Sequence, residues 1–326
     1  MVGLAGCGFG PGEDRGSARL VVTSDYGGDV LIDEPVDGLT ETSTAMRILD
    51  DSAELETRYG GGFVQAVDGV SGRTSDGRRS DWFYSVNGVV ADRGAAELTV
   101  EDGDRVWWDY RDWTDAMEVG AVVGSFPAPM VGGYDGATWP VRVDCFRLRE
   151  VCSEVESKLR AEGARLASDP EVADGPPGSA AGDARADGRD GEDVVRFMVG
   201  PWGAVGESPE AGSLERGPAR SGVFARFEVS TSPVPAGDGR ERSPNGAAAA
   251  PHLIGLDQRA EAVRDFGPDA GLVAAMRRGD GPPVWLVTGG SAAGVGKAAN
   301  ALDQTSLRNR YAAIVTDGRV VSLPLP

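Results

Sequence analysis

The side chains best suited to bind a ligand are aromatic and lie near the end of the first third of the chain. In the strand-like run 105–111, alternation turns every second residue toward the core and sends Trp107 to the opposite face, with Trp113 beyond the strand end. Exposed tryptophans beside Asp109 would suit a flat, partly apolar ligand or a protein partner. We therefore predict a ligand-binding site formed by Trp107, Asp109 and Trp113, together with Tyr59.

A second candidate chemistry is hydrolysis, with Ser291 as nucleophile and the single histidine, His252, as base. The sequence after Ser291 lacks the second glycine of the G-x-S-x-G motif, and His252 follows an alanine-rich stretch instead of a strand end. The same segment fails the phosphate-loop pattern because residue 298 is alanine, where Mg²⁺ needs a hydroxyl ligand. A strand, a turn capped by Ser291 and a helix over 294–302 account for these residues, so we expect no enzyme active site here.

Two of the three cysteines lie where a strand-like run turns into a helix. Cys145 and Cys152 are separated by six residues, which can bring their Cα atoms within the ~4.4 to 6.8 Å that a disulfide requires. We predict that they are bonded, because an even pair of cysteines is free to oxidise in an exported protein. The alternative is a pair of small, buried, reduced side chains in a cytosolic protein.

The third cysteine belongs to a motif near the N-terminus. Leu4-Ala5-Gly6-Cys7 fits the lipobox of bacterial lipoproteins, and residues 8–17 have the composition of a flexible tether. A complete signal needs ~7 to 15 apolar residues before the cleavage site, so either the signal is truncated at its start or the match is accidental. We predict lipidation at Cys7, with residues 1–17 as truncated signal and tether; the alternative is a disordered start. No apolar run approaches the ~18 residues of a membrane span.

The charge of the chain restricts its partners. The formal net charge is −19, and residues 18–120 carry 22 acidic against 9 basic side chains. A surface of that sign repels phosphate backbones and anionic lipid, so nucleic acid is not an expected partner and a membrane is expected only through the lipid anchor. For the first domain, this charge favours a ligand that is neutral, cationic or aromatic.

The first domain alternates strands with one helix. Two strand-like runs at 18–23 and 29–36 are followed by a short helix with Thr/Ser N-cap candidates, and by further strands at 63–67, 81–92 and 105–111. The Asn-Gly dipeptide at 87–88 predicts a tight hairpin. Such an order describes a small α+β sheet with the helix packed on one face.

These runs also carry a family resemblance. The series Tyr59-Gly60-Gly61, Trp82-Phe83-Tyr84-x-Val86-Asn87-Gly88, Gly94-Ala95 and Asp102-Gly103-Asp104-x-Val106-x-Trp108-x-Tyr110 resembles a bacterial domain of unknown function related to the C-terminal domain of transcobalamin. The resemblance covers residues 18–120. It implies a β-grasp-like fold and, because vertebrate relatives close over cobalamin with this domain, a corrinoid-like or other flat ligand; no resident cofactor is expected.

The second half has a different pattern. After a linker at 121–139, continuous apolar strand-like runs punctuated by helical stretches predict an α/β module over 140–326, with a sheet buried on both faces. Residues 168–192 and 231–250 are rich in Asp, Gly, Ala and Pro, and we expect them to be disordered insertions.

Together these features favour an exported, lipid-anchored, non-enzymatic binding protein on the extracellular face of the cell membrane, with a small molecule or an envelope protein as its partner. The alternative is a structural or protein-interaction factor of the cell envelope, in which Trp107 and Trp113 meet a partner. A hydrolase using Ser291 comes third.

Overall fold

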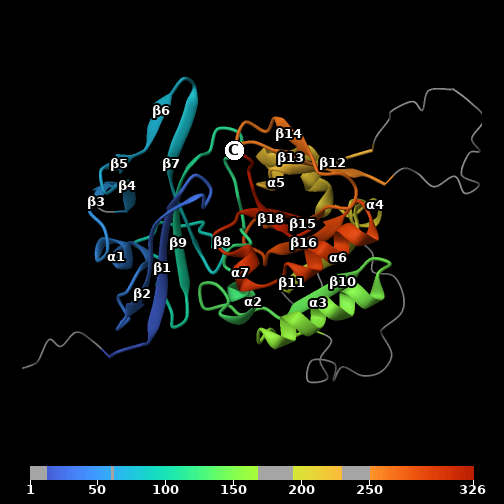
Figure 1. Ribbon diagram of the computed structural model, residues 1–326. Helices are drawn as coiled ribbons and strands as arrows, with labels where there is room; N and C mark the ends of the chain where they lie inside the picture. The colour runs from blue at the N-terminus through green and yellow to red at the C-terminus, as the bar shows by residue number, and fades with distance from the viewer. Residues whose placement is uncertain (1–12, 60–61, 168–193, 230–249) are drawn as a thin grey trace, which may run out of the picture.

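The computed structural model describes residues 13–59, 62–167, 194–229 and 250–326. Cys7, the predicted insertion 168–192 and nearly all of 231–250 lie outside the described residues. The described chain forms two β-rich halves that lie side by side, the first coloured blue to cyan and the second green to red (Figure 1). It is an α+β structure with more strands than helices.

The first half is built on a mixed sheet. Its two central strands are parallel and the outer ones antiparallel, and a small three-stranded sheet lies beside it. In spatial order the main sheet comprises β2 (Asp29–Asp37), β1 (Ser17–Ser24), β9 (Arg105–Asp112), β7 (Arg78–Val86) and β6 (Arg73–Ser75), with β8 (Val89–Val90) also paired to β7; the small sheet comprises β3 (Leu55–Arg58), β4 (Phe63–Val67) and β5 (Val70–Ser71).

Local sequence accounts for the helix and the hairpin of this half. The helix α1 (Ala45–Asp50) begins after Thr44, whose hydroxyl accepts a hydrogen bond from the Arg47 amide, and it buries its apolar side against the sheet. Asn87 and Gly88 join β7 to β8 with φ of 54° and 80°, which confirms the predicted Asn-Gly turn.

The second half contains a six-stranded sheet covered on both faces. Helices α3 (Arg149–Ala161) and α6 (Ala292–Asn300) pack on one face, and a three-stranded sheet with short helical turns covers the other. The six strands are β10 (Val141–Cys145), β11 (Val195–Pro201), β16 (Val284–Gly289), β15 (Gly271–Met276), β17 (Ala312–Thr316) and β18 (Arg319–Leu323). The covering elements are β12 (Ala225–Glu228), β13 (His252–Leu256), β14 (Ala262–Asp265), α4 (Trp202–Val205), η2 (Ala211–Arg216) and α5 (Pro218–Ser221); α2 (Ala128–Val131) and α7 (Gln304–Leu307) lie at the junction with the first half.

The predicted disulfide is present. Cys145 at the end of β10 is bonded to Cys152 in the first turn of α3, with their Cα atoms 5.8 Å apart. The bond ties the edge of the six-stranded sheet to the helix that covers it.

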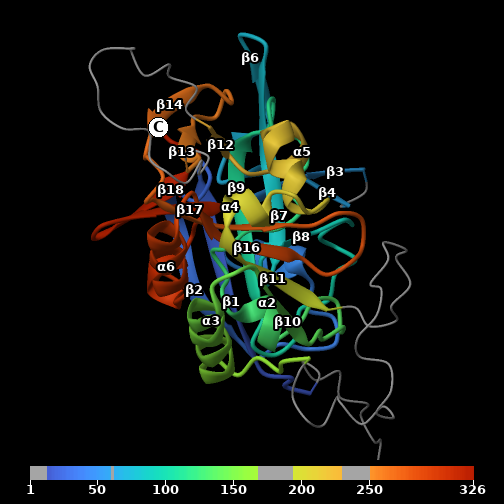
Figure 2. The ribbon, with the colours of Figure 1, turned by 90° about the vertical axis from the view of Figure 1, so that its right-hand side faces the viewer.

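The two halves are packed against each other along the face of the first sheet opposite α1. Figure 2, viewed from the side of the second half, shows β1, β7 and β9 directly behind it. Tyr26 of the β1–β2 turn makes edge contacts with Phe224 and Tyr311 of the second half, at 5.2 and 4.9 Å between ring centroids. The segment 121–139, expected as a linker, contributes Val123 and Phe126 to the buried core at this junction.

Candidate functional site

Trp107 is buried at the junction of the two halves. It is 2% exposed, its Nε1 donates to Thr23 Oγ1 at 2.8 Å, and its ring meets Tyr311 edge-on at 5.4 Å. Alternation placed Trp107 on the correct face of β9, but the expectation that it is exposed is wrong, because the second half covers that face. Trp107 is therefore part of the packing between the halves.

Asp109 lies beside Trp107 and is also fully buried. Its carboxylate accepts hydrogen bonds from Thr23 Oγ1 at 2.5 Å, the amides of Tyr26 and Gly27 at 3.1 and 3.0 Å, and the Tyr311 hydroxyl at 3.0 Å. Burial raises the pKa of Asp109, and the four donors oppose that rise. Asp109 thus links the β1–β2 turn to the second half and offers no exposed oxygen to a ligand, contrary to the sequence prediction.

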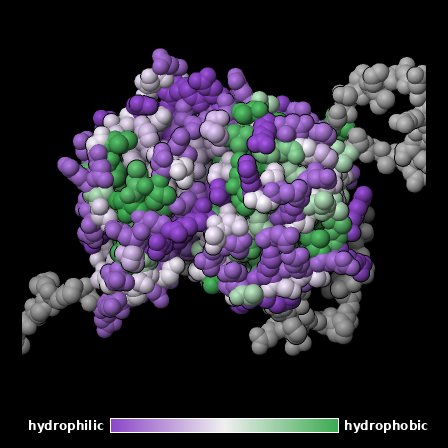
Figure 3. Space-filling view, viewed as in Figure 1, coloured by the Kyte–Doolittle hydropathy of each residue, from purple (hydrophilic) through white to green (hydrophobic). Residues whose placement is uncertain are grey.

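The other two predicted residues, Tyr59 and Trp113, line one pocket of about 430 Å³ on the first half. We call it the aromatic–arginine pocket. On the face shown in Figure 3, hydrophobic side chains gather over β3, β4 and α1, apart from those of the second half. The pocket is lined by Arg58, Tyr59, Phe63, Gln65, Gly72, Arg73, Thr74, Arg79, Ser80, Asp81 and Trp113.

The two predicted aromatic residues of this pocket each contact a phenylalanine ring. Tyr59 is 88% exposed, has a φ of 52°, and meets Phe63 edge-on at 6.4 Å. A positive φ is uncommon for a bulky residue, and here it accompanies a ring presented to solvent. Across the pocket, Trp113 stacks under the Arg79 guanidinium at 3.9 Å and contacts Phe83 at 6.5 Å.

The charge of the pocket is opposite to that of its domain. Arg58, Arg73 and Arg79 line it, against one carboxylate, Asp81, which accepts a hydrogen bond from the Trp82 amide at 2.9 Å. Burial raises the pKa of Asp81, which favours its neutral form relative to a solvated carboxyl. Guanidinium groups therefore outnumber carboxylates in this pocket, in contrast to the domain as a whole.

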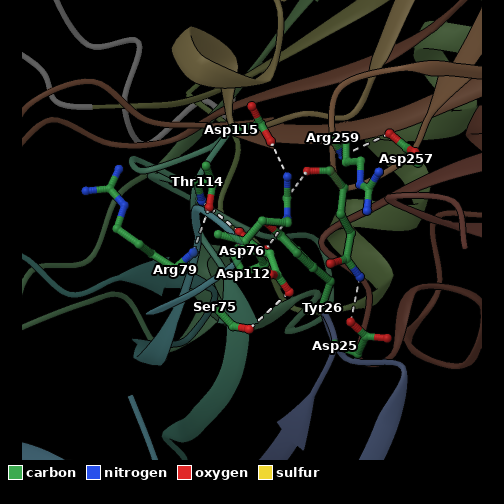
Figure 4. A network of polar contacts seen from close by, with 12 residues as sticks. Asp25, Tyr26, Ser75, Asp76, Arg79, Asp112, Thr114, Asp115, Asp257 and Arg259 are labelled. Carbon is green, nitrogen blue, oxygen red and sulfur yellow. Dashed lines mark hydrogen bonds and ion pairs between the residues drawn. The ribbon is translucent and has the colours of Figure 1, made fainter. Parts of the chain in front are cut away.

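The wall of the pocket is fixed by the hairpin of β6 and β7, which bonds to the second half. Arg78 forms ion pairs with Asp112 at 2.5 Å and Asp115 at 3.0 Å and donates to the Gln258 carbonyl at 3.1 Å. Gln258 in turn donates to Asp25 Oδ1 at 2.5 Å. Figure 4 shows these carboxylates gathered between the hairpin and the loop of the second half, so docking of the halves also positions the pocket.

Sequence reasoning missed the three arginines. No strand is predicted from the sequence between residues 67 and 81, although the Asp76-Gly77 dipeptide there is a hairpin signal. In the structure both residues have positive φ, and Thr74 and Arg79 face each other across the hairpin. The turn would have placed Arg73 and Arg79 near each other, whereas Arg58 comes from a separate strand.

Ser291 and His252 have different carboxylate partners. Ser291 Oγ donates to Asp269 at 2.5 Å and accepts from the Gly294 amide at 3.3 Å, which confirms the predicted cap of α6. His252 Nδ1 lies 2.9 Å from Asp265 Oδ2. The serine therefore has a complete structural role at the helix start.

Comparisons with known proteins concern mainly the first half. Residues 42–112 match the family described as Domain of unknown function (DUF4430). No curated protein matches the chain. A crystal structure of a candidate metal-binding protein from Ruminococcus gnavus ATCC 29149 is similar at 16% identity, covering 30% of this chain and 97% of that chain with a TM-score of 0.24.

The described residues offer neither a cluster of metal ligands nor a membrane-spanning helix. In the ranges that the structure describes, no group of three or more His, Cys, Asp or Glu side chains is arranged to hold a metal ion. Over those same ranges, no helix is long and apolar enough to cross a membrane.

Proposed function

We propose that this protein is a non-enzymatic binding protein whose aromatic–arginine pocket takes a flat, anionic small molecule. The observation that carries the proposal is the convergence of Tyr59 and Trp113 with three guanidinium groups around one cavity. Its volume falls in the range of about 300 to 1,000 Å³ that small-molecule sites occupy. Aromatic rings offer stacking surface and arginines offer paired donors, so a planar ligand with an acidic group satisfies both.

The sheet of the first half supports a β-grasp-like assignment and, through it, the relation to the transcobalamin C-terminal domain. A β1–β2 hairpin precedes α1, and β9 returns to lie parallel to β1 at the centre of the sheet. A corrinoid-like ligand is the version of the flat ligand that this relation favours.

The proposal extends to location: an exported protein, lipid-anchored at Cys7 on the extracellular face of the membrane. It rests on Leu4-Ala5-Gly6-Cys7 and on the bond between Cys145 and Cys152, since disulfides persist mainly in oxidising compartments. Membrane partitioning of the protein expressed from its gene with upstream sequence, with and without globomycin, tests the anchor. A product that stays in the soluble cytoplasmic fraction under both conditions contradicts it.

The ligand is tested by calorimetric titration of the full chain with three probes: riboflavin 5′-phosphate, which is planar and anionic, riboflavin, which is planar and neutral, and hydroxocobalamin. We expect riboflavin 5′-phosphate to bind more tightly than riboflavin. Tyr59→Ala and Trp113→Ala should each weaken it about tenfold, because an aromatic contact is worth about 0.5 to 1.5 kcal/mol beyond the area it buries. Arg73→Gln should bring the two flavins closer in affinity.

The matched control is Arg142→Gln, which removes an equally charged, exposed side chain from β10 in the second half. It should leave all affinities unchanged. If none of the three probes binds, or if Tyr59→Ala and Trp113→Ala bind them as the wild type does, the pocket is not the ligand site. A protein-interaction role would then depend on Trp113 alone, because Trp107 is buried.

A further inference from the structure

A larger cavity lies between the two halves, away from the aromatic–arginine pocket. It has a volume of about 730 Å³, and we call it the interdomain cleft. Its walls come from the β1 and β9 strands, the segment around α2 and the α7 helix of the second half. The polar side chains that line it are Arg19, Asp102, Arg105, Ser125, Gln304, Thr305 and Arg308.

The arginines of the cleft are not equally neutralised. Arg19 and Arg308 both form ion pairs with one carboxylate, that of Asp33. Arg19 Nε lies 2.5 Å from Asp33 Oδ1, and Arg308 Nη2 contacts Asp33 Oδ2. Arg105 Nη2 instead donates to the neutral Asn309 Oδ1 at 2.6 Å. Two cations therefore surround one anion, and a third cation stands beside them. With Asp102, which also lines the cleft, three guanidinium groups face two carboxylates.

Arg105 also has an unused donor. Its Nε is buried and, among the described residues, has no hydrogen-bond partner. Burial lowers the pKa of Arg105 to about 10, which leaves the side chain protonated at neutral pH. A buried, charged donor without an acceptor is costly, so an acceptor that enters the cleft gains more here than at a solvated arginine.

Ser125 is the second unpartnered group of the cleft. It is 2% exposed, and its Oγ finds no hydrogen-bond partner within the part of the chain that the structure describes. Like Arg105 it lines the cleft, and both side chains can donate a hydrogen bond. Two unsatisfied donors, one of them charged, therefore lie just beneath the surface of one cavity, where a side-chain rotation would let them meet the acceptor oxygens of a carboxylate or phosphate.

Part of the lining of the cleft is apolar. Phe126, Pro127, Ala128 and Val131 belong to it, and Val131 is 48% exposed. An inorganic ion would leave this surface uncovered, whereas an acid with a hydrocarbon body would bury it.

We propose that the interdomain cleft binds an amphiphilic organic anion, with its acidic group on Arg105 and Ser125 and its apolar body on the segment 126–131. This site is independent of the aromatic–arginine pocket, because the two share no lining residue. Since the cleft is formed by both halves, its ligand also stabilises their docking.

The test is calorimetric titration of the full chain with octanoate, octyl phosphate and, as the neutral probe of the same chain length, 1-octanol. We expect either anion to bind at least tenfold more tightly than 1-octanol, and the tighter of the two identifies the acidic group as carboxylate or phosphate. Ser125→Ala should weaken that anion about 5- to 10-fold, and Arg105→Gln should weaken it more.

The matched control is Arg58→Gln, which removes an arginine of the aromatic–arginine pocket and should leave octanoate and octyl phosphate binding unchanged. Circular dichroism checks that each variant is folded; if Arg105→Gln is not, Ser125→Ala decides. Three results overturn the proposal: no binding of either anion, equal binding of 1-octanol, or a loss of anion binding in Arg58→Gln instead of Ser125→Ala. The first two results leave the flavin test of the first pocket untouched, whereas the third assigns these anions to the aromatic–arginine pocket instead.

Discussion

Gly27 offers a direct test of how tightly the two halves are docked. It lies in the β1–β2 turn with a φ of 81°. A Cβ added there would clash with the carbonyl oxygen of Asn309 in the second half, at less than 3.0 Å, and would lie 3.0 Å from Trp107 Cζ2. Gly38 has a similar φ, 71°, but a Cβ there would meet nothing within 4 Å. The substitutions Gly27→Ala and Gly38→Ala therefore share the backbone strain and differ in the contact across the junction.

The magnitudes follow from these contacts. A left-handed conformation costs alanine about 1 to 2 kcal/mol more than glycine, and this applies to both variants. At Gly27 the obstructing atom is a backbone carbonyl, which no side-chain rotation can move away. The halves must separate locally, which at least weakens the bond from Tyr311 to Asp109, a hydrogen bond to a charged group worth about 1.5 to 3 kcal/mol. We expect Gly27→Ala to cost about 3 to 5 kcal/mol and Gly38→Ala about 1 to 2 kcal/mol.

Urea unfolding followed by tryptophan fluorescence measures the difference, since Trp107 lies at the junction that opens. Gly27→Ala should shift the midpoint to lower urea and change the Trp107 environment in the native baseline, while Gly38→Ala should shift it only modestly. Equal losses in the two variants would refute the reasoning, because the junction would then add nothing to the backbone strain that both share.

Two further substitutions test the junction and the disulfide. Tyr311→Phe removes the hydroxyl donor to Asp109 and should cost about 1.5 to 3 kcal/mol at pH 7, against less than about 0.5 kcal/mol for the control Tyr110→Phe. Because burial raises the folded-state pKa of Asp109, the contribution of this carboxyl to stability is lost as pH rises through that pKa. Without the Tyr311 donor the pKa is higher still and the loss extends to higher pH, so a difference in urea midpoint between the two proteins that does not grow with pH would contradict this. Reducing the Cys145–Cys152 bond, with a sequence separation of 7, should cost about 2 to 3 kcal/mol and lower Tm, whereas the double serine variant should not respond to reductant.

Local patterns in the sequence predicted the longer strands of the first half and its Asn-Gly turn, but not the short strands β3, β5 and β6 or what covers the main sheet. Period-two alternation placed Trp107 and Trp108 on opposite faces of β9, as the structure has them. It could not say that a second half covers the Trp107 face, since that contact joins residues about 200 positions apart, such as Asp109 and Tyr311. No local signal marked that cover, because the face of β9 that carries Trp107 also carries Arg105, Asp109 and Arg111, and such charged residues indicate a solvent-exposed face.

The residues of the candidate site were likewise predicted only in part. Tyr59 and Trp113 were predicted from residue type, and the structure brings them together at one pocket. The arginines came from the pairing of β6 with β7 and from a separate strand, β3, which no local periodicity specifies. Arg78 shows why: its ion pairs with Asp112 and Asp115 depend on which strands are neighbours, and only the folded topology decides that.

The net charge of −19 and the two arginine-lined cavities act at different ranges. At physiological ionic strength, charges on the surface are screened over about 8 Å, so an approaching polyanion meets the acidic surface before any cavity. A small anion that enters a cavity meets guanidinium groups at contact distance, where they are screened least. We therefore expect the acidic surface to discriminate against large polyanions such as nucleic acid, while the arginines that line the cleft and the pocket would meet small ones. In both proposals the sign of the ligand follows from the few side chains that line each cavity, and we expect the overall charge to select by size.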